Sequence, residues 1–309
     1  MSATPPPSHA IPLVQNRRAA IEAFVSAFAF ATMSTLVHAF GDRIAWPVVA
    51  CARIAFTFLF ALAVIRATGA PIIIRGNRVL WIRSLVGTMG VFCTFYALTH
   101  MYVTDAVTII ATNPIWVMVI LTVFFNHRLP WVVMFDVLLA ISGVLVMERP
   151  GFDSETFPML VALASAIISA TVKVCLSRLG GLPAPSVVAH HTGVATMATL
   201  FTSLFLVDRV VLSADVTPAI WFLLVPVGFL GTVAQLMMTS SFGRGNTLMV
   251  TIVSLSNIAF AAAYDVLFWD RTFDRYHALG AGMIATAIII SVRRTAREVA
   301  AAQPAALDD

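Results

Sequence analysis

Residues 103–125 form an apolar stretch with an amide and a proline at its middle, Asn113 and Pro114. About 20 apolar residues suffice for a helix to cross the hydrocarbon core of a membrane. Proline removes a backbone N–H and clashes with the carbonyl four residues back, so the helix kinks or opens there. Opened backbone inside a membrane is tolerated only against protein or a water-filled cavity. The stretch therefore predicts a polar binding site within the membrane.

Other polar side chains also fall inside apolar stretches, where a charge costs about 2.5–3.5 kcal/mol and usually faces the bundle interior. The planar fork of Arg53 suits a carboxylate or phosphate of a substrate; snorkelling or helix pairing is its alternative role. The amides of Asn113 and Asn257 either bind substrate or join neighbouring helices. The residues predicted to line a substrate site are Arg53, Tyr96, Asn113, Trp116, Gln235 and Asn257.

A second group of ionisable residues suits a gate or a proton relay. Asp105 is placed to pair with Arg53, and Asp136 is hypothesised to pair with Arg83 or Lys173. Histidine titrates near neutral pH, which suits a proton site. A position at the wet interface is the alternative explanation for several of them. The candidates are His38, Arg83, Asp105, Asp136, Lys173, His190 and Asp265.

The composition predicts a polytopic α-helical membrane protein. Of its 309 residues 60% are hydrophobic and only 11% are charged, against about 25% charged in an average soluble domain. The charge of +4 at pH 7 is explained by placement near the membrane and not by nucleic-acid binding. Cys51, Cys93 and Cys175 lie in apolar stretches without metal-ligand spacing. No metal or cofactor is expected.

Ten spans with short connections are predicted, and most of the 19 Lys and Arg residues lie on the side of the two termini. The positive-inside rule then places both termini in the cytoplasm and the protein in the cytoplasmic membrane. The predicted parts are a disordered tail 1–18, a first repeat 19–149, a second repeat 150–292 and a cytoplasmic tail 293–309. The predicted spans are 20–40, 46–66, 79–99, 104–125, 131–148, 157–178, 185–207, 218–240, 247–269 and 276–292.

The two halves of the chain resemble each other. With an offset of 144 residues, Thr112-Asn113 falls on Ser256-Asn257. Five spans is an odd number, so the second copy must have the opposite orientation in the membrane. Inverted repeats of this kind are common in secondary transporters, with the substrate site near the midplane between the copies.

A series of short motifs in residues 83–151 carries a resemblance to a known family. Arg83 opens a span that closes with Phe95-Tyr96-Ala97-Leu98, and Asp105-Ala106 and Pro114 follow. Asn126-His127-Arg128-Leu129 and Gly143, in the segment ISGVLVMERPG, complete the series. In order and spacing these resemble the drug/metabolite transporter superfamily and its EamA-type group, over residues 20–292.

The resemblance implies ten helices in two EamA repeats and secondary transport of small organic metabolites. Relatives of this kind export amino acids or carry S-adenosylmethionine, and an exporter of drugs or other metabolites is the alternative. Two departures stand out. The sequence has Asn126-His127-Arg128 where the family usually has Gly-Glu-Arg, and Ile258 where a proline is common.

Three functions compete on sequence grounds. A secondary transporter fits the repeats and the mid-membrane site, with a small-molecule substrate and the proton as a candidate coupling ion. An intramembrane enzyme is disfavoured, since the sequence has no His-Glu-x-x-His or Gly-x-Ser-x-Gly motif. A channel would require rings of charge or filter carbonyls from several subunits. The substrate, the direction of transport and the oligomeric state stay open.

Overall fold

All the regular secondary structure described in the computed structural model is α-helical, over residues 13–40, 46–75, 77–100, 103–126, 129–149, 156–205, 218–268 and 274–302. A helix satisfies its own backbone hydrogen bonds, which an apolar chain needs in a bilayer without water. The helices are α1 (Leu13–Phe40), α2 (Trp46–Thr68), α3 (Arg78–His100), α4 (Val103–Ile110), α5 (Asn113–Phe125), α6 (Trp131–Glu148), α7 (Thr156–Arg178), α8 (Ala184–Phe205), α10 (Pro218–Arg244), α11 (Thr247–Ser254), α12 (Ser256–Phe268) and α13 (Arg275–Ala302).

Nine stretches of these helices are long and apolar enough to cross a membrane. Two of the nine combine a pair of short helices, α4 with α5 and α11 with α12. The helix outside the nine is α8, which has 22 residues and whose His190, His191 and threonines lower its hydropathy. Nine of the ten predicted spans are therefore present in the described residues, and the span at α8 stays a prediction.

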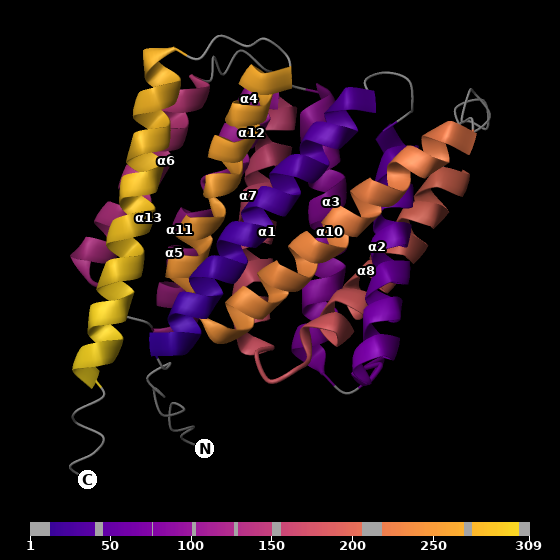
Figure 1. The fold of residues 1–309 in the computed structure, drawn as a ribbon, viewed down its shortest axis with the longest axis horizontal. Coiled ribbons are helices and arrows are strands. Elements are labelled where there is room, and N and C mark those ends of the chain that lie inside the picture. The colour runs from indigo at the N-terminus through magenta and orange to yellow at the C-terminus, as the bar shows by residue number, and fades with distance from the viewer. Residues whose placement is uncertain are drawn as a thin grey trace.

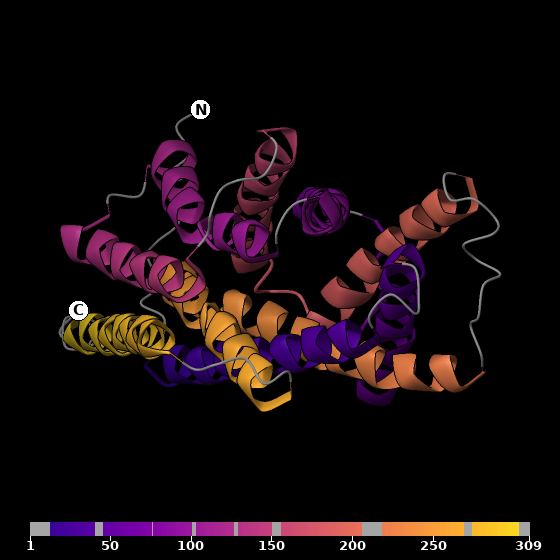
Figure 2. The same cartoon turned by 90° about the horizontal axis from the view of Figure 1, so that it is seen from above.

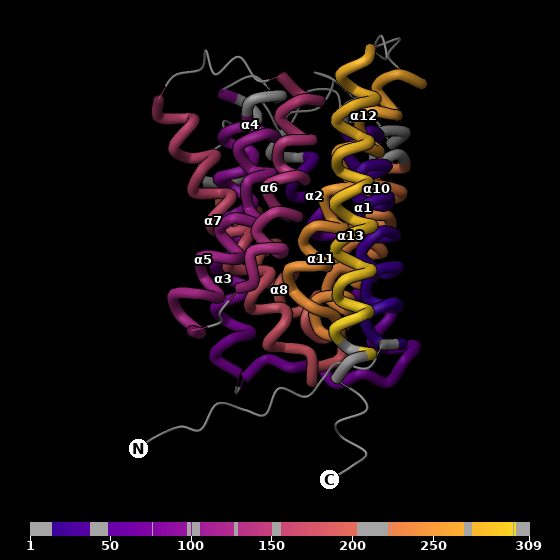
Figure 3. Tube along the Cα trace, turned by 90° about the vertical axis from the view of Figure 1, so that its left-hand side faces the viewer, coloured from indigo at the N-terminus to yellow at the C-terminus, as the bar shows by residue number. Residues whose placement is uncertain are grey.

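The helices pack side by side along one direction (Figure 1). Seen from above, α1 and α10 lie along one side of the bundle and α3 and α7 along the other (Figure 2). The beginning of α1 and the end of α13 lie at the same end of the bundle (Figures 1 and 3), which is called the terminal end below. Which side of the membrane this end faces stays a prediction.

Both helical ends of the chain are longer than the sequence suggested. The helix α1 begins at Leu13 and α13 continues to Ala302, so 13–18 and 293–302 are helical where tails were expected. Polar contacts hold these segments to the bundle. The backbone N–H of Asn246 donates to Asn16 Oδ1 at 3.0 Å, and Arg294 forms an ion pair with Asp136 at 2.6 Å.

The helices α6 and α13 lie against each other along their length (Figure 3). Gly143, in the second half of α6, and Gly280, in the second turn of α13, let the two backbones approach closely: a Cβ on Gly280 would lie 2.5 Å from the carbonyl oxygen of Gly143. At the end opposite the terminal end, Arg149 pairs with Asp274. Backbone N–H groups of His277 and Tyr276, the His277 side chain and Arg149 hold the pKa of Asp274 well below its usual range. The two helices are therefore joined at both ends and tightly packed between them.

Replacing Gly280 with alanine is expected to destabilise the protein by about 1–3 kcal/mol, because overpacking forces the backbones of α6 and α13 apart. Gly282, on the same helix, is the matched control, since nothing lies within 4 Å of a Cβ built there. We expect Gly282→Ala to leave stability unchanged or slightly raised, as alanine favours helix. The midpoints of thermal unfolding of the two purified variants test this prediction. Equal midpoints would contradict the close approach of the backbones of α6 and α13 at Gly280.

Candidate functional site

The two pairs of short helices correspond across the two halves of the chain. The offset of 144 residues that relates Asn113 to Asn257 also relates the start of α4, Val103, to the start of α11, Thr247. The ends of these two helices, Ile110 and Ser254, correspond as well. The described helices are thus interrupted at matching positions in both halves, as expected for a transporter with repeats.

The second interruption shows that proline is not required for the break, because Ile258 stands where the first half has Pro114. The shared feature is a hydroxyl side chain that bonds to a carbonyl three residues back. Thr112 Oγ1 donates to Ile109 O at 2.7 Å, and Ser256 Oγ donates to Val253 O at 2.8 Å. Such bonds compete with the helical pattern. The sequence-based explanation from proline was incomplete.

Lys173 of α7 contacts both interruptions. Its ammonium group donates to Asn113 Oδ1 at the start of α5, and Ser254 Oγ at the end of α11 lies 3.5 Å from Nζ. Lys173 is 8% exposed and Asn113 7%. The last carbonyls of α11 carry the negative end of a helix dipole, which favours a cation there. One ammonium group therefore connects the broken helices of the two halves.

Lys173 has neutral oxygen atoms as its hydrogen-bond partners in the described residues. Within the described residues, the carboxylates that form ion pairs do so with arginines or a histidine and not with Lys173. Asp136 pairs with Arg294, Glu22 with Arg18 and Arg244. A buried cation without a counter-charge is costly, so an acidic ligand would be favourable beside Lys173.

A second cationic group lies between α3, α8 and α10. Arg83 is 1% exposed, and its Nη2 donates to Gln235 Oε1 at 3.4 Å. Arg83 Nη1 and His191 Nδ1 both lie 3.3 Å from a Cβ built on Gly87, and Arg53 Cγ lies 4.0 Å from a Cβ built on Gly231, one turn of α10 from Gln235. Of the two adjacent histidines, His191 is the buried one, whereas His190 contacts Ser84 at 2.8 Å and the ring of Trp81. The structure thus brings Arg53, Arg83 and Gln235 towards one region, with His191 added.

The remaining candidates include Asn257, which lies at the second interruption in the first turn of α12. Tyr96 stacks on His100 with 4.0 Å between ring centroids, and Trp116 packs against the apolar cluster around Val117 and Val137. The Oδ1 atom of Asn257 is buried and makes no hydrogen bond within the described residues. Asp265 is half-buried. The side chains of His38 and Asp105 lie outside the described residues.

Asp136 does not have the partner that the sequence suggested. Its carboxylate is fully buried and pairs with Arg294 of α13 at 2.6 Å, so the hypothesis of a pair with Arg83 or Lys173 is wrong. Arg294 was assigned to a tail, and only the continuation of α13 brings it to Asp136. It also lies 3.6 Å from Glu298.

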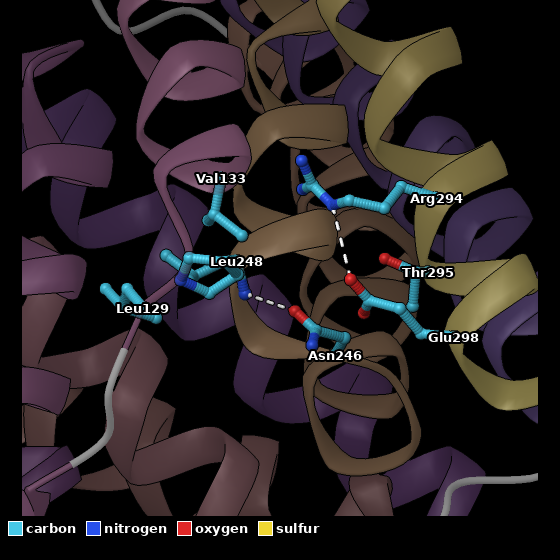
Figure 4. Close-up of a pocket in the computed structure, with 8 residues that line it drawn as sticks. Leu129, Val133, Asn246, Leu248, Arg294, Thr295 and Glu298 are labelled. Atoms are coloured by element: carbon cyan, nitrogen blue, oxygen red, sulfur yellow. Dashed lines mark hydrogen bonds and ion pairs between the residues drawn. The ribbon is translucent and has the colours of Figure 1, made fainter. Parts of the chain in front are cut away.

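A small cavity lies beside this ion pair at the terminal end (Figure 4). Its volume is about 80 Å³, which suits a few waters and not an organic substrate, since small-molecule sites occupy about 300–1,000 Å³. Arg294 and Glu298 reach it from α13, and Asn246 caps α11 by accepting from the backbone N–H of Leu248 at 3.0 Å. The lining residues are Leu129, Pro130, Val133, Asn246, Leu248, Arg294, Thr295 and Glu298.

One signal that distinguishes Lys173 was present in the sequence. Lys173 is the single lysine of the chain, and every other fixed positive side chain is an arginine. Lysine presents a compact charge on a flexible stem, whereas arginine presents a planar fork. Ser254 and Arg294 had no comparable signal, because their roles depend on tertiary contacts.

Comparison with solved structures supports the fold. A crystal structure superposes with a TM-score of 0.78 at 15% sequence identity, over 91% of this chain and 99% of the other. At this identity the likeness concerns the fold alone.

Comparison with known sequences yields transporters. The chain is 25% identical to the pseudopaline exporter CntI of Pseudomonas aeruginosa strain UCBPP-PA14 over 271 residues, which is 86% of this chain and 93% of the relative. It is 23% identical to a riboflavin transporter of Brucella anthropi over 198 residues, which is 60% of this chain and 69% of the relative.

The resemblance found in the sequence is confirmed by a family match in each half of the chain. The EamA-like transporter family matches residues 17–149 and again residues 156–293. These two matches contain the two interrupted helix pairs described above. The protein is therefore a member of the EamA-like transporter family.

Proposed function

We propose that this protein is a secondary transporter that moves a small organic metabolite with an acidic group across the cytoplasmic membrane. The acidic group binds at Lys173. The observation that carries this proposal is the contact of one buried ammonium group with both helix interruptions, through Asn113 and Ser254. In transporters with repeats, interrupted helices supply the substrate site.

The acidic character of the substrate follows from the partners of Lys173. An ammonium group forms shorter and stronger hydrogen bonds with a carboxylate than with the neutral oxygens of Asn113 and Ser254. A carboxylate that enters the site would accept one or more hydrogen bonds from the ammonium group of Lys173 in place of these oxygens. Metabolites that resemble amino acids or S-adenosylmethionine carry such a carboxylate, and both remain in the proposed substrate class.

The proposed mechanism is alternating access by ten helices in two inverted repeats, with both termini cytoplasmic. Lys173 belongs to the second matched segment, and it contacts Asn113 from the first. A movement of one half against the other would therefore change its partners. We propose export as the direction, because the relatives from Pseudomonas aeruginosa are named exporters.

Transport from loaded proteoliposomes tests this function. Vesicles with the full chain are loaded with amino acids, dicarboxylic acids and S-adenosylmethionine, together with the carboxamide of each acid. Mass spectrometry then follows the compounds that appear outside, with protein-free vesicles as the control. The proposal expects release of at least one acid in clear excess over its carboxamide. Equal release of each acid and its amide, or no release beyond that from protein-free vesicles, would refute it.

A further inference from the structure

Arg83 and His191 present unpaired polar atoms at one point of α3. In the described residues Nε and Nη1 of Arg83 and Nδ1 of His191 are buried without a hydrogen-bond partner. The bond from Arg83 Nη2 to Gln235 is long, at 3.4 Å. Buried polar groups are nearly always paired, and a buried guanidinium with two free donors is costly.

The point where these atoms converge is Gly87. A Cβ built on Gly87 would lie 3.3 Å from Arg83 Nη1, 3.3 Å from His191 Nδ1 and 2.9 Å from His191 Cε1. Any side chain at position 87 would push the imidazole away from the helix. The glycine therefore allows two unpaired nitrogen atoms of different helices to lie around the same spot.

The guanidinium of Arg83 makes this spot positive. None of the ion pairs formed within the described residues includes Arg83. The stem of Arg53 reaches α10 one turn from Gln235, since its Cγ lies 4.0 Å from a Cβ built on Gly231. An arginine fork binds carboxylate and phosphate oxygens well.

We propose that Arg83, His191 and Gly87 form a second anion-binding site, which takes a carboxylate or phosphate group. The site is separate from the one at Lys173, whose partners lie on α5 and α11. Two sources can supply the group: a second acidic group of the transported metabolite, or a free inorganic anion. The inference extends the proposed function with a second site but has its own residues and its own test.

Inorganic phosphate is the first probe, titrated at constant ionic strength into the purified full chain while the midpoint of thermal unfolding is followed. A ligand that binds the folded state raises this midpoint in a saturable way. We expect the apparent affinity to fall at least tenfold in Arg83→Gln and in Gly87→Ala. Arg78→Gln should keep the response; Arg78 is exposed and lies on the same helix.

The glycine variant has a matched control. A Cβ on Gly90 would lie 2.8 Å from Ile168 Cγ2, so Gly90→Ala introduces a similar clash on α3 against an apolar side chain. If the stabilisation by phosphate is lost in Gly87→Ala and kept in Gly90→Ala, the loss comes from the anion site and not from a disturbed helix α3.

The second probe is the acid that the proteoliposome assay identifies. If phosphate has no effect but this acid stabilises the chain in a way that needs both Arg83 and Gly87, the anionic group belongs to the substrate. The proposal is overturned if neither phosphate nor any acid of the transport panel gives a stabilisation that depends on Arg83 and Gly87. Acid transport that needs Lys173 alone would in that case leave the proposed function intact.

Discussion

The variant Lys173→Gln is expected to weaken binding and transport of the acidic substrate by about tenfold to a hundredfold. A hydrogen bond to a charged group contributes about 1.5–3 kcal/mol, and about 1.4 kcal/mol corresponds to a factor of ten. Glutamine can still bond to Asn113 and Ser254, so the fold should persist. Initial rates of acid release from proteoliposomes measure the effect.

Two further variants complete this experiment. Lys173→Arg keeps the charge but replaces a compact ammonium with a planar fork, and we expect it to restore little of the transport. Arg66→Gln, at an exposed position of α2, controls for the loss of a positive charge elsewhere. Transport by Lys173→Gln at the rate of the parent protein would show that Lys173 serves only to join the helices.

The variant Arg294→Gln is expected to lower the free energy of unfolding by about 3–5 kcal/mol, the usual result when one partner of a buried ion pair is removed. The carboxylate of Asp136 has 0% exposure, so it stays buried without its counter-charge. The side chain of Arg294 is 16% exposed and reaches the cavity beside it (Figure 4). Denaturant titration of the purified protein measures the loss.

Replacement of the other partner, Asp136, gives the control. Asp136→Asn removes the buried charge and keeps the shape, and Arg294 can then turn its charge towards the cavity and Glu298. We therefore expect Asp136→Asn to cost less than Arg294→Gln, and the double variant to recover part of the loss. If Asp136→Asn lowers the free energy of unfolding more than Arg294→Gln does, the deeper burial of Asp136 does not determine the stability of this pair.

The positions of the helices could be predicted because hydropathy decides them. The predicted span 131–148 coincides with α6, Trp131–Glu148, and the break near Asn113 follows from local chemistry. The second break was not visible, since Ile258 replaces proline and the bond from Ser256 to Val253 depends on a side-chain orientation. The sequence analysis matched Thr112-Asn113 to Ser256-Asn257 but predicted no break there.

The partners of the buried charges could not be predicted. Asp136 pairs with a residue of α13 and Lys173 with residues of α5 and α11, all distant in the sequence. Hydropathy sets the depth of a residue in the bundle but not the neighbour that it faces. Adjacent histidines point about 100° apart on a helix, so the sequence alone did not show that His191 and not His190 lies inside.

The most direct test of the acid site uses the single lysine of the chain. Labelling with [¹³Cε]lysine gives one side-chain signal in an NMR spectrum, and it belongs to Lys173 without further assignment. We expect this signal to shift in a saturable manner when the transported acid is added, and to stay in place when its carboxamide is added at the same concentration. A signal that does not move while the acid is bound would contradict the proposal that Lys173 holds the acidic group of the substrate.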